Sequence, residues 1–196
     1  MEWIAHRINT LAELQRTPFE MGVELDLRDV GDELVLQHDP FSTGESFESY
    51  LAHYRHGTMI LNIKSERIEW KVLELIQKYK IPNYFFLDSS FPMIVQLNQK
   101  GELNTAIRFS EYEGMDTIAG MAGKASWVWI DSFAALRLTG DQSRQMKEWG
   151  YKLCLVSPDL QGRPEEIPAY KTYLEDAGIT LDAICCKTAN MERWAR

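Results

Sequence analysis

The 196-residue sequence contains only three cysteines, and their placement argues against a disulfide framework. Cys154, Cys185 and Cys186 form an odd set, and two of them are adjacent in a mostly apolar stretch. Their spacing does not match a zinc site. Free buried thiols are typical of a reducing compartment, so we expect a cytoplasmic protein.

Long apolar runs and an excess of basic residues are also missing. No segment reaches the roughly 20 apolar residues of a membrane-spanning helix, and a strand expected from Trp3 leaves no room for a signal peptide. We therefore expect no transmembrane segment. The net charge of -8 and the pI of about 5.1 argue against nucleic acid or an anionic membrane as a partner. A local basic pocket for one phosphate is compatible with these values.

The remaining composition is that of a globular protein, with 45% hydrophobic and 26% charged residues. We expect a single domain spanning residues 1–196. The sequence gives no prediction of oligomeric state.

Strand and helix patterns alternate eight times along the chain. We expect strands at residues 3–6, 22–28, 58–64, 84–88, 105–110, 127–131, 151–156 and 181–186. Ser65 is expected to cap one of the intervening helices, and residues 136–149 to form another. This rhythm predicts a parallel sheet covered by helices, and eight units favour a compact (β/α)₈ TIM-like barrel. An open doubly wound sheet is the alternative, but the glycine-rich loop that often follows its first strand is missing.

Polar residues fall on one face of several expected strands. In the stretch from Gly22 to Leu27, Glu24 and Asp26 share one face and lie roughly 7 Å apart, while valine and leucine form the other face. Asn62 and Lys64 share a face of the next barrel strand, and Trp129 and Asp131 share a face of a later one. In a barrel these faces point inward, and they carry the site where the strands end.

Two histidines and two cations lie at element ends near this acidic pair. His6 and Arg7 end the first strand, and His38 follows the arm after the second. Imidazoles exchange protons near neutral pH, so one can accept a proton while the other donates one. Arg7 and Lys64 either form salt bridges with the acids or bind phosphate oxygens.

The combined pattern resembles the glycerophosphodiester phosphodiesterase family of phospholipase C-like phosphodiesterase barrels. The residues that carry the resemblance are His6-Arg7, Asn9-Thr10, Glu24-Leu25-Asp26, His38-Asp39, Asn62-Ile63-Lys64 and Ser89-Ser90-Phe91. They cover roughly the first half of the chain, and the second half matches only in its rhythm of strands and helices.

The resemblance implies a metal-dependent phosphodiesterase that acts on a small phosphodiester such as a glycerophosphodiester. Its general acid and base would be His6 and His38, with Lys64 as a further catalytic residue. Arg7 and Lys64 would contact the phosphate. The divalent ion, Mg²⁺ or Ca²⁺, would be held by three residues: Glu24, Asp26 and Asn62. The substrate's own hydroxyl can attack phosphorus in this family, which gives a cyclic phosphate.

Two departures from the family pattern leave alternatives open. The third metal carboxylate of the family is replaced by Asn62, so Asp88, Glu111 or Asp131 is a candidate substitute. The short segment before Asn9 is also similar to that of sphingomyelinase D-type phospholipases, which release a cyclic phosphate. The alternatives are therefore such a lyase and a degenerate barrel that binds phosphodiesters without catalysis. A weaker third alternative is a sugar-phosphate isomerase or aldolase with Lys64 as a Schiff-base lysine.

Overall fold

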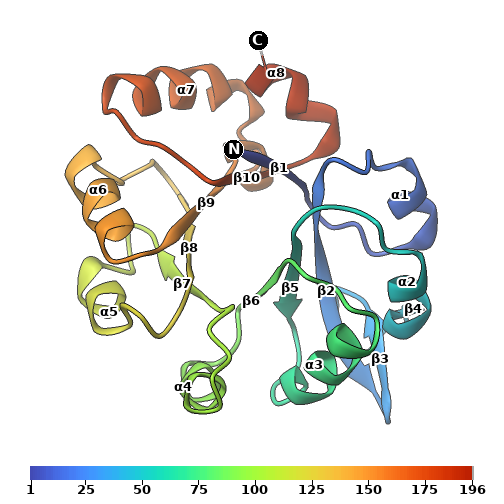
Figure 1. Cartoon of the computed structure of the whole chain (residues 1–196). Helices are drawn as coiled ribbons and strands as arrows, with labels where there is room; N and C mark the ends of the chain where they lie inside the picture. Colours follow the sequence, from blue (N-terminus) through green and yellow to red (C-terminus); the bar gives the residue numbers. More distant parts are fainter. Residues whose placement is uncertain (196) are drawn as a thin grey trace.

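Eight parallel strands form a barrel in the computed structural model, which describes residues 1–195 (Figure 1). The strands are β1 (Glu2–Ala5), β2 (Gly22–Val30), β5 (Met59–Ile63), β6 (Tyr84–Leu87), β7 (Ala106–Phe109), β8 (Trp127–Ile130), β9 (Lys152–Val156) and β10 (Ala183–Cys186). They follow one another around the wall, and β1 pairs with β10. A bridge between Phe86 and Thr105 joins β6 to β7. The predicted (β/α)₈ barrel is therefore confirmed.

A short antiparallel arm extends β2 beyond the barrel wall. The end of β2 pairs with β3 (Glu33–Leu36), and β3 pairs with β4 (Glu45–Ser46). The Arg28 guanidinium donates two hydrogen bonds, of 3.1 and 2.8 Å, to the carbonyl of His38. These bonds hold His38 near the end of β2, at the mouth of the barrel.

Helices surround the strands (Figure 1). The α-helices are α1 (Leu11–Arg16), α2 (Phe47–His53), α3 (Glu69–Lys78), α4 (Phe91–Gln99), α5 (Met115–Gly120), α6 (Gly140–Glu148), α7 (Ile167–Asp176) and α8 (Met191–Ala195). The 3₁₀ turns are η1 (Pro158–Gln161), η2 (Pro164–Glu166) and η3 (Thr188–Asn190). Thr10 caps α1 through a reciprocal capping box with Glu13.

Two expected helix starts are wrong. Ser65 does not cap α3, because Arg67 adopts a left-handed conformation with φ of 69°, which a right-handed helix cannot include. The helix begins at Glu69 instead. Residues 136–139 lie outside α6, because Thr139 is extended and its side chain accepts a hydrogen bond from Gln142 N as the N-cap.

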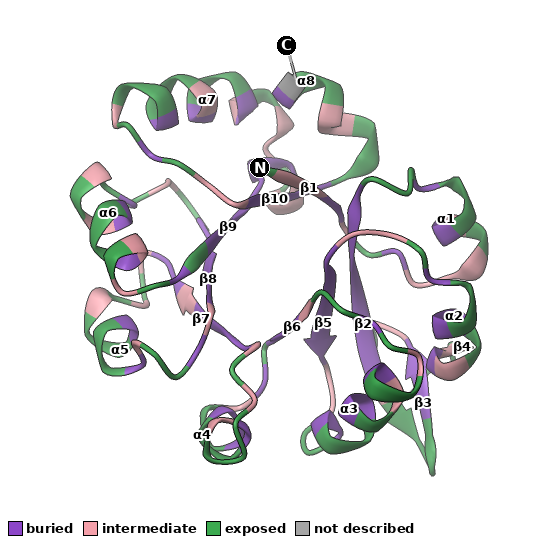
Figure 2. Ribbon diagram, in the orientation of Figure 1, coloured by how far each residue is buried: buried purple, intermediate pink, exposed green. Residues whose placement is uncertain are grey.

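Side-chain alternation along the strands separates two apolar layers. Figure 2 shows that the strands are mostly buried, whereas the surrounding helices carry exposed residues. Val23, Leu25 and Leu27 pack outward against the helices, as predicted. The barrel interior is filled by eleven buried residues, including Trp127, Trp129 and Cys154. Where the strands end, polar side chains replace the apolar ones on the inner face. A site can therefore form at that end of the barrel.

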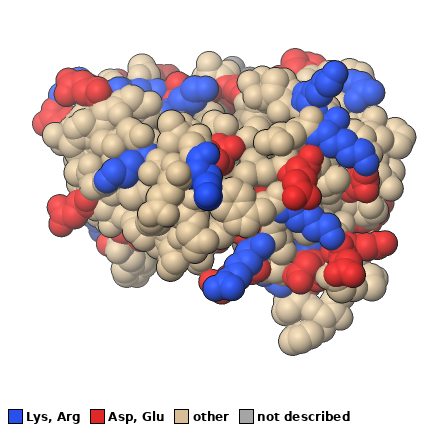
Figure 3. Space-filling model, turned by 60° about the horizontal axis from the view of Figure 1, so that its bottom comes forward, with Lys and Arg blue, Asp and Glu red and all other residues tan. Residues whose placement is uncertain are grey.

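The surface offers no extended basic area on the face drawn in Figure 3, where acidic and basic side chains are interleaved. Within residues 1–195, none of the helices combines the length and the apolar character needed to cross a bilayer.

Candidate active site

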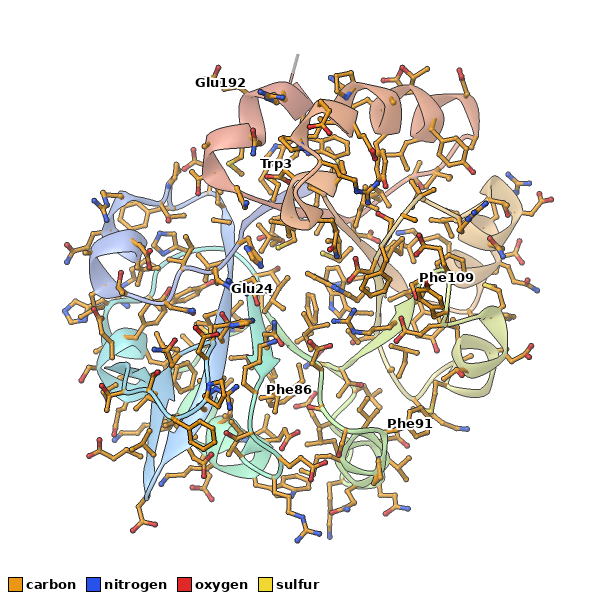
Figure 4. All side chains as sticks on the ribbon, turned by 180° about the vertical axis from the view of Figure 1, so that it is seen from behind. Trp3, Glu24, Phe86, Phe91, Phe109 and Glu192 are labelled. Atoms are coloured by element: carbon orange, nitrogen blue, oxygen red, sulfur yellow. The ribbon has the colours of Figure 1, made fainter. Side chains whose placement is uncertain are left out.

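A cavity of about 500 Å³ opens at the ends of the barrel strands. Six residues singled out from the sequence line it: His6, Arg7, Glu24, His38, Asn62 and Lys64. Figure 4 shows Glu24 on the side of β2 that faces the barrel interior. The structure therefore brings together side chains from four separate segments, at the end of a TIM-like barrel where such sites lie.

The segment after β1 is tied to β2 by its own polar groups. Arg7 has a φ of 59°, an uncommon backbone conformation for a non-glycine residue, and its backbone N–H donates to Glu24 Oε2 at 2.8 Å. Asn9 donates to Asp26 Oδ2 at 2.9 Å and accepts from the Asp26 backbone N–H at 2.8 Å. These bonds hold both acids in place from one side.

Glu24 is buried in an unfavourable electrostatic environment. Burial, together with the neighbouring Asp26 carboxylate, raises the pKa of Glu24 to about 7. The amide of Asn62 donates to Glu24 Oε1 at 2.8 Å and partly offsets this effect. A cation close to Glu24 would lower its pKa again.

Three cations face the acids of the cavity. Lys64 Nζ lies 3.6 Å from both Asp26 Oδ1 and Asp88 Oδ2. Arg7 Nε lies 3.5 Å from Asp26 Oδ2. The third cation is Arg108, whose Nε donates to Asp88 at 2.7 Å and whose Nη1 donates to Asp131 at 3.0 Å.

The sequence reasoning missed Arg108. Alternation along β7 would have indicated it, because Ile107 and Phe109 pack outward and Arg108 must then point inward. Its second amino group, Nη2, has no hydrogen-bond partner within residues 1–195, and the side chain lines the cavity. An anion in the cavity can bind to this group.

The candidate substitutes for a third metal carboxylate are engaged elsewhere. Asp88 and Asp131 are held by Arg108. Glu111 accepts hydrogen bonds from the backbone N–H groups of residues 133–135, at 3.0, 2.7 and 2.8 Å. Desolvation raises the pKa of Glu111, but these bonds and one from its own backbone N–H outweigh it and lower the pKa to about 2.

Two buried oxygen atoms fit a divalent cation. Asp26 Oδ1 and Asn62 Oδ1 have no hydrogen-bond partner within residues 1–195. With Glu24 they form a set of two carboxylates and one amide oxygen, the donor chemistry that Mg²⁺ and Ca²⁺ prefer. The described residues contain no cluster of three or more His, Cys, Asp and Glu suited to a metal. Three protein ligands would not fill the coordination shell of a hard ion, so water or substrate oxygens would supply the remaining ligands.

The two histidines differ in environment. Burial, followed by the positive charge of Arg7, lowers the pKa of His6 to about 4, so that His6 is neutral at pH 7. Its Nε2 lies 3.6 Å from Glu24 Oε2. His38 is more exposed, and Asp39 Oδ1 lies 2.8 Å from its Nδ1. The remaining nitrogen of His38, Nε2, can exchange a proton with a ligand.

The aromatic residues near the mouth divide into two groups. Trp127 and Trp129 are buried in the barrel interior. Tyr112 and Phe133 are exposed, and their ring centroids lie 5.8 Å apart. They flank the site rather than fill the core.

The fold and the site together define a (β/α)₈ barrel with an acidic and basic cavity at its strand ends. Neither the protein-family models nor the curated proteins contain a match to this sequence. Solved structures do resemble the fold over nearly the whole chain.

Two of these structures are glycerophosphodiester phosphodiesterases by name. One, from Agrobacterium tumefaciens str. C58, superposes with a TM-score of 0.69 at 17% identity and covers 100% of this chain and 99% of its own. Another, a glycerophosphoryl diester phosphodiesterase from Parabacteroides distasonis ATCC 8503, has a TM-score of 0.65 at 14% identity. It covers 98% of this chain and 85% of its own. At these identities the likeness establishes the barrel fold.

Proposed function

We propose that this protein is a metal-dependent phosphodiesterase that cleaves a small phosphodiester, such as a glycerophosphodiester. The observation that carries the proposal is the shared cavity at the strand ends, which is lined by two histidines, the buried Glu24 and three cations, with Asp26 buried beside two of those cations. The structural neighbours named as glycerophosphodiester phosphodiesterases support the same reaction class.

Phosphate binding falls to the cations. Lys64 and Arg7 are already close to carboxylates, and Arg108 retains a free amino group. A phosphodiester that enters the cavity meets these groups in a partly buried setting, where charge-assisted hydrogen bonds are strong. They orient the phosphorus and offset charge that develops on its oxygens.

Proton transfer falls to the histidines. His6 is neutral at pH 7 and accepts the proton of the attacking hydroxyl, which belongs to the substrate's own alcohol. For this step His38 carries a proton on both ring nitrogens: it donates the one on Nε2 to the leaving oxygen, while its Nδ1–H donates to Asp39, which orients the ring. The first product is then a cyclic phosphate.

Glu24, Asp26 and Asn62 would hold the divalent ion. When bound, the ion supplies charge neutralisation at the phosphoryl oxygens. The two oxygens of Asp26 and Asn62 that lack a hydrogen-bond partner support this assignment.

We place this activity in the cytoplasm, on a small-molecule substrate rather than on nucleic acid. Support comes from the three cysteines, which are buried and free, and from the acidic pI of about 5.1.

The test is phosphodiester turnover followed by phosphorus NMR on metal-stripped protein, before and after addition of Mg²⁺, Ca²⁺ or Mn²⁺. We expect turnover that requires the ion and a cyclic phosphate signal. His6→Ala and His38→Ala should each lower turnover by about 10²-fold or more. His53→Ala, at an exposed histidine of α2, is the matched control and should leave turnover unchanged.

Two results would contradict the proposal. Wild-type turnover in both histidine variants would remove the acid-base assignment. An adduct on Lys64 after borohydride treatment with a sugar phosphate would favour an aldolase instead.

A further inference from the structure

A second cavity of about 450 Å³ adjoins the cavity of the candidate active site, which we call the catalytic cavity. We call it the side groove. It is lined by the loop after β6, by α4, by β7 and by the loop and helix that follow β7. Asp88, Arg108 and Glu113 line both cavities. A ligand held at Arg108 can therefore extend from one cavity into the other.

The walls of the side groove carry exposed aromatic surface. Phe91, at the start of α4, is 48% exposed, and Tyr112 is 82% exposed. Figure 4 shows Phe91 toward the outside of the barrel. Ile94 and Ile107 supply the apolar floor. Phe133, which contacts Tyr112, lines the catalytic cavity, so aromatic surface runs from the catalytic cavity to the groove.

A buried hydroxyl in the groove has no partner. Ser89 is only 9% exposed, lines the groove and has no hydrogen bond to its Oγ within residues 1–195. Buried polar atoms are nearly always paired, and one that is left unpaired is destabilising. Once the Ser89 side chain rotates toward the groove, a polar atom of a ligand would pair with this hydroxyl, which points to a bound group that is not purely apolar.

We propose that the side groove binds one ester group of the phosphodiester, and that this group is an aromatic ring with a polar atom at its edge. The ring packs against Phe91 and Tyr112, and its polar edge pairs with Ser89. An alkyl chain would leave the Ser89 hydroxyl without a partner. The inference rests on the proposed function and specifies its substrate, because bare glycerol would leave the aromatic walls in water.

The test compares the affinities of three phosphodiesters for the full chain by NMR titration: dimethyl phosphate, phenyl methyl phosphate and hexyl methyl phosphate. We expect the phenyl ester to bind about tenfold more tightly than dimethyl phosphate, and more tightly than the hexyl ester. Phe91→Ala combined with Tyr112→Ala should reduce the preference to about threefold or less. Thr117→Trp, which fills the groove, should have the same effect.

A matched control and a polar probe sharpen the comparison. Phe19→Ala removes an exposed aromatic residue between α1 and β2, away from the groove, and should keep the full preference. A 3-hydroxyphenyl methyl ester should bind several-fold more tightly than the phenyl ester, and Ser89→Ala should abolish that gain.

The possible failures are distinguishable. If all three diesters bind equally, the groove proposal is wrong and the phosphate site stands. If the hexyl ester binds as tightly as the phenyl ester, the ring is the wrong ligand class. If none of them binds, the proposed function fails, and the groove proposal falls with it.

Discussion

Replacement of Asn62 by aspartate tests the proposed ion site most directly. Asn62 Nδ2 lies 2.8 Å from Glu24 Oε1, so Asn62→Asp puts a third carboxylate within about 4 Å of a buried acid. Two unit charges at that distance repel by about 4 kcal/mol at an effective dielectric constant of 20. Protonation of one acid relieves part of this, so we expect the variant to lose about 2–4 kcal/mol of stability in chelator.

The same charge should strengthen ion binding. Affinity for hard cations depends on the number of charged ligands, and one added carboxylate should raise it roughly 10- to 100-fold. The assay is calorimetric titration with Mg²⁺ or Ca²⁺, with thermal unfolding in chelator and in excess ion. Asn62→Leu is the matched control, because it removes the hydrogen bond to Glu24 without adding charge.

The reasoning would be refuted if Asn62→Asp bound the ion no more tightly than the wild type. Equal losses of stability in chelator and in excess ion would lead to the same conclusion. The leucine control should lose stability in both conditions and bind the ion more weakly.

Three further predictions concern charge. Burial raises the pKa of Glu24 from 4.5 to about 7, so the folded protein holds this proton more tightly than the unfolded chain does. The resulting stabilisation is fully present below pH 4.5 and is lost as the pH rises through 7. Relative to Glu24→Gln, chelator-treated wild type should lose up to about 3 kcal/mol between pH 5 and pH 8 in urea unfolding. Glu111→Gln should cost about 1–2 kcal/mol in the same assay, because it weakens three backbone hydrogen bonds. Calorimetry should show that dimethyl phosphate raises Mg²⁺ affinity by about tenfold.

The barrel and several residues of the candidate site could be predicted from local sequence patterns. Two-residue alternation placed Glu24, Asp26, Asn62 and Lys64 on the inner face without knowledge of the fold. Once strands are parallel, their ends meet, so residues distant in sequence converge on one cavity. The histidines could be added because each lies at the end of a strand or arm.

The rest of the candidate site depends on contacts between elements, which local patterns do not encode. Alternation shows that Arg108 points inward but not which acids it meets. Arg108 lies beside Asp88 and Asp131 only because β7 is flanked by β6 and β8 in this register. The side groove arises between loops whose spacing is set by helix packing. The start of α3 was missed because the left-handed turn at Arg67 has no glycine or asparagine to mark it.

The charge balance of the cavity links ion binding to substrate binding. Five carboxylates line or border it: Glu24, Asp26, Asp88, Glu113 and Asp131. Three permanent cations face them: Arg7, Lys64 and Arg108. Negative charge is in excess even with Glu24 half protonated near pH 7, and a phosphodiester monoanion adds to it. A divalent cation would offset two of these charges, whereas the diester alone would leave a larger partly buried net charge. Because such a charge is costly to keep from water, each should bind more tightly in the presence of the other. We propose that the ion binds at the oxygens of Asp26 and Asn62 that lack a hydrogen-bond partner.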